Sequence, residues 1–243
     1  MSSLWNTVLY EPIYNTLIFI VDKVTFGDIG FGIIILTILI KLVLSPLTRK
    51  SIRSQVLMKR IEPELKALKK EFPNKEEQAK KTFELYKKYN VNPFSGCLVI
   101  LLQLPVIFAL YYVFYRGLSF DAGPLYSFIK APENINAQFL GLIDLHGKSV
   151  VFALLAGISQ FIQGKLSAPL KPKNIEIVTS DEPEAPKTFQ EQLSDSMQMN
   201  VRYVLPVFVA FIAYQISAAI ALYWITSNIF TIVQEWRVRR SLV

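Results

Sequence analysis

A single lysine, Lys41, lies inside a long apolar stretch of the sequence. Burying a lysine at the centre of a bilayer costs about 2.5 kcal/mol or more, so such residues usually face a protein interior or a watery cavity. Thr37 and Ser45 lie four residues before and after Lys41 and therefore share its face of a helix. This polar stripe predicts a hydrophilic groove whose positive charge is Lys41.

No acidic residue lies in the apolar cores of the five stretches described below, and the core of the last stretch covers residues 218–234. We therefore expect Lys41 to be available to an acidic group that arrives from outside the protein. The alternative is that its long side chain snorkels to the membrane surface. The basic cluster at Thr48-Arg49 begins only seven residues later, which is roughly 10 Å along a helix.

Three polar or aromatic residues of later apolar stretches could complete such a groove, namely Gln160, Gln163 and Trp224. The alternative for each is an ordinary contact between helices, because a hydrogen bond there is worth about 1 kcal/mol or less. Gln163 can equally lie at the membrane interface, and Trp224 can serve as a packing residue. For most other polar residues of these stretches, Gln103 included, we expect ordinary contacts.

Enzyme chemistry is poorly supported, because the sequence contains one cysteine, Cys97, and one histidine, His146. An intramolecular disulfide is impossible, and a Cys/His metal site lacks ligands. A Ser-His-Asp site would depend on His146, which lies beside Asp144 between two apolar stretches. We predict that the protein is not an enzyme and uses no metal or cofactor.

Five apolar stretches are long enough to cross a bilayer as helices, which need about 20 residues each. The predicted spans are residues 29–48, 93–116, 149–166, 201–217 and 218–236. Together the last two would form one helix of about 50 Å, too long for a hydrocarbon core of about 30 Å. We therefore predict a tight turn near Ser217, and an all-α membrane protein with five transmembrane helices around the groove.

Residues 1–28 are expected to form an amphipathic helix on the outer membrane surface, because their unbroken apolar part is too short to span. A short sixth span is the alternative, and we expect no cleavable signal peptide because no basic segment precedes this stretch. The apolar positions are Trp5, Leu9, Ile13, Leu17 and Ile20, with Asn6, Glu11, Asn15 and Asp22 elsewhere around the helix.

Residues 49–92 predict a helical hairpin in the cytoplasm, with a turn at Pro73-Asn74. Two apolar stripes at helical spacing would face each other, and Pro63 is expected to kink or interrupt the first helix. The stripes comprise Ile52, Val56, Ile61, Leu65, Leu68 and Phe72, followed by Ala79, Phe83, Tyr86 and Asn90.

The distribution of Lys and Arg predicts the orientation, because cytoplasmic loops carry the excess of positive charge. Residues 49–88 hold thirteen basic side chains, and the tail 237–243 adds three arginines. The loop 117–148 holds few and is predicted outside, whereas the loop 167–200 is predicted in the cytoplasm. The protein is thus predicted to be a multi-pass protein of the cell membrane with its N-terminus outside and its C-terminus in the cytoplasm.

Three motifs resemble the YidC family of membrane protein insertases, in a short form without a large extracytoplasmic domain. One is VNPFSGCLVILLQLP at Val91–Pro105, which is similar to the Asn-Pro, Gly-Cys and Gln-x-Pro signature of that family. The others are LYWITSN at Leu222–Asn228 and the first span followed by Pro46-Leu47-Thr48. The resemblance extends over residues 5–240.

The resemblance implies five core spans around a groove that is open to the cytoplasm and to lipid and closed toward the outside. Lys41 stands where the family has a groove arginine, and Thr37 and Trp224 match positions used beside it. A lysine is a point charge that lacks the bidentate fork of arginine. Two further departures are the sequence at 215–218, where the family often has a Pro-Ser-Gly-like turn, and the short tail.

The function implied by the resemblance is the insertion of other membrane proteins. Polar segments would cross through the groove, and apolar helices would leave into lipid along an apolar slide of Cys97, Leu101, Phe208 and Ile212. The expected partners are nascent membrane proteins and lipids, with a ribosome and a Sec-type translocon as further candidates, and no specific nucleic acid. The alternative is a small-solute or anion transporter that uses the same cavity.

Overall fold

The computed structural model describes residues 5–72, 74–92, 95–115, 125–132, 134–167 and 203–242, and their fold is mainly helical, as predicted. A π-helical turn η1 (Asn6–Tyr10) and helix α2 (Glu11–Lys23) precede the long helix α3 (Ile29–Glu71). The later helices are α4 (Lys75–Lys88), α5 (Ser95–Tyr115), α6 (Val150–Ser167), α8 (Leu205–Gln215) and α9 (Ala218–Arg240). Strands β1 (Gln138–Phe139) and β2 (Ile143–Asp144) pair antiparallel.

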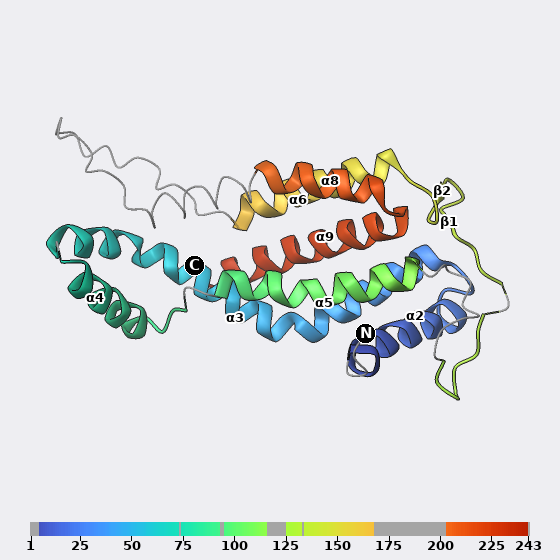
Figure 1. Cartoon of the computed structure of the whole chain (residues 1–243), viewed down its shortest axis with the longest axis horizontal. Coiled ribbons are helices and arrows are strands. Elements are labelled where there is room, and N and C mark those ends of the chain that lie inside the picture. The colour runs from blue at the N-terminus through green and yellow to red at the C-terminus, as the bar shows by residue number, and fades with distance from the viewer. Residues whose placement is uncertain are drawn as a thin grey trace.

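Helices α3, α5, α6, α8 and α9 form one elongated bundle, in which α9 packs against the other four (Figure 1). The first turns of α9 can approach their neighbours closely because Ala218, Ala219 and Ala221 are small and fully buried. The bundle has two ends. We name them the loop end, which carries β1, β2 and the turn between α8 and α9, and the tail end, which carries the last turns of α6 and α9.

Two helices among the described residues are long and apolar enough to cross a membrane, within Ile29–Leu68 and Val150–Ser167. The apolar segments Leu101–Phe114 and Leu205–Gln215 are shorter. Helix α8, with 11 residues, is about 16 Å long, and residues 201–202 of the predicted fourth span lie outside the described residues. The number of spans therefore remains a prediction.

The predicted turn between the last two helices is confirmed. Helix α8 ends at Gln215, and Ser217 has an extended backbone (φ −92°, ψ 153°) before α9 begins. Ala218 N donates to Gly147 O at 2.8 Å, and Ala219 N donates to Leu145 O at 3.2 Å. These bonds satisfy amides that the start of a helix leaves free, so the segment after β2 is fastened to α9.

Helix α2 packs into the bundle against α3 and α5, and its residues Leu17 and Ile18 are fully buried. Asn15, predicted on the polar side, is also buried. Its Nδ2 donates to Glu11 O at 2.9 Å, and its Oδ1 accepts from Tyr126 N at 2.8 Å. The buried face is therefore wider than the predicted apolar stripe, whereas the position of this helix on the outer membrane surface remains a prediction.

Helix α3 continues beyond the bundle as the first arm of a helical hairpin, and α4 returns beside it (Figure 1). The helix is unbroken at Pro63, so the interruption considered for this proline does not occur. Asn74 caps α4 by accepting from Glu76 N at 3.0 Å, and Tyr89 Oη donates to Glu64 Oε1 at 2.6 Å across the two arms. The hairpin is thus a direct extension of α3.

Candidate functional site

Lys41 is buried among α3, α5 and α9, with 8% of the residue exposed. Its Nζ donates to Gln103 Oε1 at 3.2 Å and to Thr231 Oγ1 at 3.1 Å. Gln103 in turn donates to the hydroxyl of Tyr223. Lys41 forms no ion pair within the part of the chain that the structure describes. Its charge is therefore faced by neutral dipoles, in what we name the Lys41 layer (Lys41, Gln103 and Thr231).

The other two residues of the predicted stripe on α3 are both buried, and Ser45 contacts α9. Thr37 is 1% exposed and donates to Ile33 O at 2.6 Å. Ser45 Oγ accepts from Gln234 Nε2 at 2.9 Å, and Thr48 Oγ1 accepts from the same nitrogen at 2.8 Å. Lys41 and Ser45 therefore form a polar seam between α3 and α9, and a hydrophilic groove along it remains a prediction.

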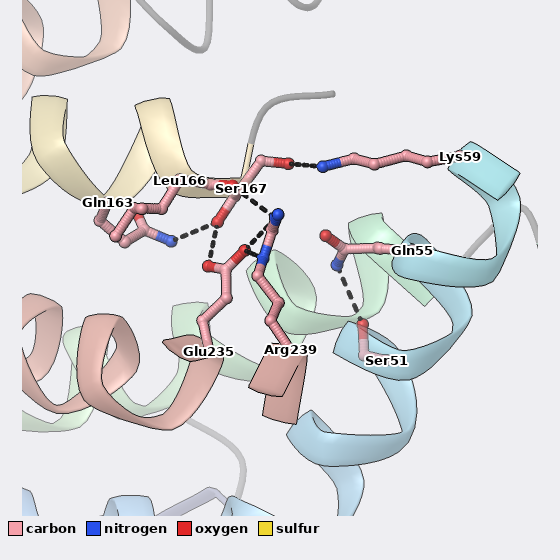
Figure 2. Close-up of polar contacts among 8 residues, drawn as sticks. All are labelled: Ser51, Gln55, Lys59, Gln163, Leu166, Ser167, Glu235 and Arg239. Carbon is pink, nitrogen blue, oxygen red and sulfur yellow. Dashed lines mark hydrogen bonds and ion pairs between the residues drawn. The ribbon is translucent and has the colours of Figure 1, made fainter. Parts of the chain in front are cut away.

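Gln160 and Gln163 belong to a different chain of hydrogen bonds, which leads to the tail end. Gln160 Nε2 donates to Gln163 Oε1 at 3.0 Å, and Gln163 Nε2 donates to Ser167 Oγ at 3.5 Å. Ser167 Oγ then donates to Glu235 Oε2 at 2.7 Å (Figure 2). Both glutamines are thus connected to Glu235, an acidic group outside the site predicted from the sequence.

Glu235 is 2% exposed and pairs with Arg239, whose Nη2 and Nε lie 2.6 and 3.0 Å from its Oε1. Arg239 also donates to Leu166 O, and Lys59 Nζ donates to Ser167 O at 3.5 Å (Figure 2). Two cations therefore cap the C-terminus of α6, where free carbonyls and the helix dipole favour positive charge. We name Gln163, Ser167, Glu235 and Arg239 the Glu235 cluster.

Lys59 lies on α3 beyond the predicted first span, where the hairpin joins the bundle. The pKa of its ammonium is lowered from 10.5 to about 8, mainly by burial and also by the nearby charge of Arg239, whereas Glu235 and Glu62 act to raise it. Titration of Lys59 therefore changes the charge beside the C-terminus of α6 in mildly alkaline solution.

The predicted slide residues lie on α5 and α8, which both pack against α9. Leu101 and Phe208 are 59% and 55% exposed, and Ile212 is half-buried. The side chain of Cys97 lies outside the described part of the structure. Trp224 is half-buried on α9 and packs against the hydrophobic core, so the contact observed for it is apolar packing.

Among the described residues, no group of three or more His, Cys, Asp or Glu side chains is placed to hold a metal ion. His146 is exposed in the segment after β2, where its amide donates to Asp144 Oδ1 at 2.9 Å. This is the loop position that its sequence context indicated.

Three residues connected to the predicted groove side chains were not identified from the sequence. Thr231 and Gln234 bond directly to Lys41 and Ser45. Glu235 is connected to Gln163 through Ser167. Thr231 and Gln234 continue the series Tyr223 and Ser227 at intervals of four, four and three residues, which is one helical face. That spacing is the signal that identifies them. Glu235 lies at the end of the predicted fifth span, and the sequence pattern around it does not indicate which helix its side chain faces.

The family model described as "60Kd inner membrane protein" matches residues 20–243. A curated protein of Fusobacterium nucleatum named "Membrane protein insertase YidC" is 32% identical over 217 residues, which are 88% of this chain and 88% of that protein. One of the same name from Pelobacter propionicus is 33% identical over 240 residues, which are 97% of this chain and 39% of that protein. The chain thus spans most of some curated relatives and less than half of others.

The crystal structure described as "Active YidC insertase crystal structure with the first transmembrane domain resolved" has a similar fold, with a TM-score of 0.56 and 19% identity. The similarity covers 96% of this chain and 46% of that one, and it supports the helical architecture alone. The curated relatives above are named insertases, in agreement with the prediction that the protein is not an enzyme. On the match of the family model and the identity with relatives of similar length, the chain belongs to the YidC family of membrane proteins.

Proposed function

We propose that the protein inserts other membrane proteins, moving short polar segments across the bilayer and releasing apolar helices into lipid. The observation that carries this proposal is Lys41, which is buried in the bundle, where its ammonium bonds to the neutral acceptors Gln103 and Thr231 and to no carboxylate among the described residues. An ionisable group inside a membrane protein is costly and typically marks a substrate pathway. The names of the curated relatives support the same activity.

In the proposed mechanism a polar segment of the substrate enters a groove that reaches partway across the bilayer. Its passage through hydrocarbon would otherwise cost several kcal/mol for each unsatisfied polar group, so a polar path lowers the barrier. An acidic side chain of the segment displaces a neutral acceptor from Lys41, because opposite charges attract strongly at low dielectric. The proposed groove residues are Lys41, Thr37, Ser45, Gln160, Gln163 and Trp224.

The apolar part of the substrate is proposed to leave between α5 and α8. Leu101 on α5 and Phe208 on α8 present exposed apolar surface, and Cys97 and Ile212 are proposed to extend it. Burial of apolar surface contributes about 25 cal/mol per Å², which gives the substrate helix its driving force into lipid. The polar seam between α3 and α9 would receive the polar segment of a substrate, and the apolar surface of α5 and α8 would receive its apolar helix.

The proposed topology has five spans, with the N-terminus outside and the tail end of the bundle in the cytoplasm. The positive charges of Arg237, Arg239 and Arg240 at the tail end support it, because cytoplasmic segments carry the excess of Lys and Arg. The hairpin of α3 and α4 would receive the nascent chain, the ribosome or lipid headgroups, and a Sec-type translocon is a further candidate partner. The alternative for the hairpin is a basic loop that only fixes the orientation.

The proposal is tested by reconstituting the protein in liposomes and measuring the insertion of single-span substrates with an acidic or a neutral tail. Lys41→Glu should impair the acidic-tailed substrate more than the neutral one, because it replaces attraction by repulsion. Lys41→Arg should insert both, because it keeps the charge.

Solute flux measured in the same liposomes separates insertion from transport. Flux without insertion would overturn the proposal and favour a transporter. Equal insertion of both substrates by the wild type and by Lys41→Glu would remove Lys41 from the mechanism.

A further inference from the structure

A pocket with a volume of about 250 Å³ opens between α6 and α8 near the loop end. Its lining is Val150, Ala153, Leu154, Ala210 and Tyr214. The two helices approach closely beside it, because a Cβ at Gly157 would lie 2.9 Å from the Cβ of Ala210. The pocket is thus an apolar recess between two tightly packed helices.

The rim of the pocket is apolar and faces outward. Val150 and Leu154 are 58% and 57% exposed, and Tyr214 is 41% exposed. In a chain that crosses a membrane, outward apolar surface of this kind lies against acyl chains, and an apolar recess does not hold ordered water. The geometry therefore favours a hydrocarbon occupant.

A cation lies directly beside this recess. Lys148 precedes α6, and its Nζ lies 5.6 Å from the ring centroid of Tyr214 and 3.1 Å from Gln215 Oε1. The nearby carboxylate of Asp144 accepts from the amide of His146 at 2.9 Å, and it forms no ion pair with Lys148 among the described residues. The start of α6 adds a partial positive charge. An occupant with an anionic headgroup and an apolar chain therefore matches both the cation and the apolar recess.

This pocket differs from the proposed slide on the same helix. Ala210 is two residues from both Phe208 and Ile212, and Tyr214 is two residues from Ile212. Two residues turn an α-helix by about 200°. The pocket therefore lies on the other flank of α8, and a substrate on the slide would not fill it.

We propose that the pocket between α6 and α8 holds one acyl chain of an anionic phospholipid, whose phosphate is bound by Lys148. The phosphate of the headgroup would replace Gln215 as the partner of the Lys148 ammonium. The acyl chain would fill the recess beside Val150 and Leu154. The proposal rests on the protein lying in a membrane and is independent of whether it inserts substrates.

The test is lipid retention by the full chain, purified from nanodiscs that contain phosphatidylglycerol and phosphatidylethanolamine in equal amounts and measured by native mass spectrometry. Val150→Trp fills the recess, and Val151→Trp is its matched control, because Val151 is 59% exposed on the same helix and does not line the pocket. Lys148→Gln removes the charge and keeps the hydrogen-bonding capacity, with Lys130→Gln as a control on an exposed loop lysine.

The wild type and both controls should retain one phosphatidylglycerol. Val150→Trp should lose the bound lipid, and Lys148→Gln should lower the preference for phosphatidylglycerol about fivefold, which is the effect of one lysine near an anionic lipid surface. Equal retention of phosphatidylglycerol by Val150→Trp and Val151→Trp would refute the pocket as the site of the acyl chain. An unchanged preference in Lys148→Gln would overturn the headgroup site. Thermal unfolding of each variant identifies a loss that is due to misfolding, and Val150→Leu then provides a milder filling variant with the same expected direction.

Discussion

The Lys41 layer and the Glu235 cluster bury charge in the same bundle in two different ways. Lys41 is held by the neutral groups of Gln103 and Thr231, whereas Glu235 is paired with Arg239 and accepts from Ser167. A buried ion pair with complete hydrogen bonding compensates its own desolvation, and a buried cation among neutral dipoles does so only in part. The Glu235 cluster is therefore suited to hold helices together, and the Lys41 layer retains attraction for an external anion.

The largest effect is expected from Glu235→Leu, which leaves Arg239 without its counter-charge. Breaking a buried pair costs about 3–5 kcal/mol, and because the side chain of Arg239 is 24% exposed we expect about 3 kcal/mol. For a chain of this size, that lowers the thermal unfolding midpoint in detergent by about 6–12 °C.

Glu62→Leu is the control for this change, because Glu62 and its partner Lys66 are 40% and 64% exposed. Such a surface pair is worth about 0.2–1 kcal/mol. Similar midpoints for Glu235→Leu and Glu62→Leu would show that the Glu235 cluster contributes no more than a surface ion pair. The double variant Glu235→Leu/Arg239→Leu should recover most of the loss.

Lys41→Met should change stability in the opposite direction. Replacing a buried charge by an apolar side chain of similar length removes its desolvation cost, and we expect a gain of about 1–2 kcal/mol in the free energy of unfolding. The same variant should lose insertion of acidic-tailed substrates, which is the usual exchange of activity for stability at a functional site. A midpoint that falls as far as that of Glu235→Leu would show that Lys41 has a structural role instead.

Thr231→Val should have a smaller effect that depends on Lys41. The change keeps the shape of the side chain and removes one acceptor of the ammonium, at a cost of about 1 kcal/mol. In the Lys41→Met background the same change should cost nothing, so a double-mutant cycle measures the coupling of the two residues. Equal costs in both backgrounds would place the contribution of Thr231 in its bond to Ser227 O.

The smallest effect concerns the pH dependence at Lys59, whose pKa is lowered by burial to about 8 in the folded state from 10.5. Between these values the unfolded chain binds more protons than the folded one, so stability rises as the pH increases from about 8 to 10.5. Lys59→Met should flatten the dependence of the unfolding midpoint on pH in this window. Lys66→Met, at an exposed position on the same helix, should not, and equal slopes for wild type and Lys59→Met would refute the assignment.

The sequence by itself determined the features that follow from local periodicity. The positions of the helices, the turn at Ser217, the helical hairpin and the shared face of Thr37, Lys41 and Ser45 all depend on residues within a few turns of one another. Spacing along one helix specifies which side chains share a face, because the helical repeat is fixed. The uninterrupted course of α3 through Pro63 was not predicted, because packing and flanking turns can retain a helix that a proline weakens.

Only the tertiary structure decided which face of one helix packs against which face of another. Thr231 is 190 positions from Lys41 and Gln234 is 189 from Ser45, and both contacts depend on how α3 and α9 are rotated and offset when they pack. The same packing directs Gln163 toward Glu235 through Ser167. Hydrogen-bond partners are selected within about 3 Å, whereas an amphipathic pattern fixes a helix face only broadly. That difference in precision is why the sequence identified the buried charge at Lys41 and only the fold identified its partners.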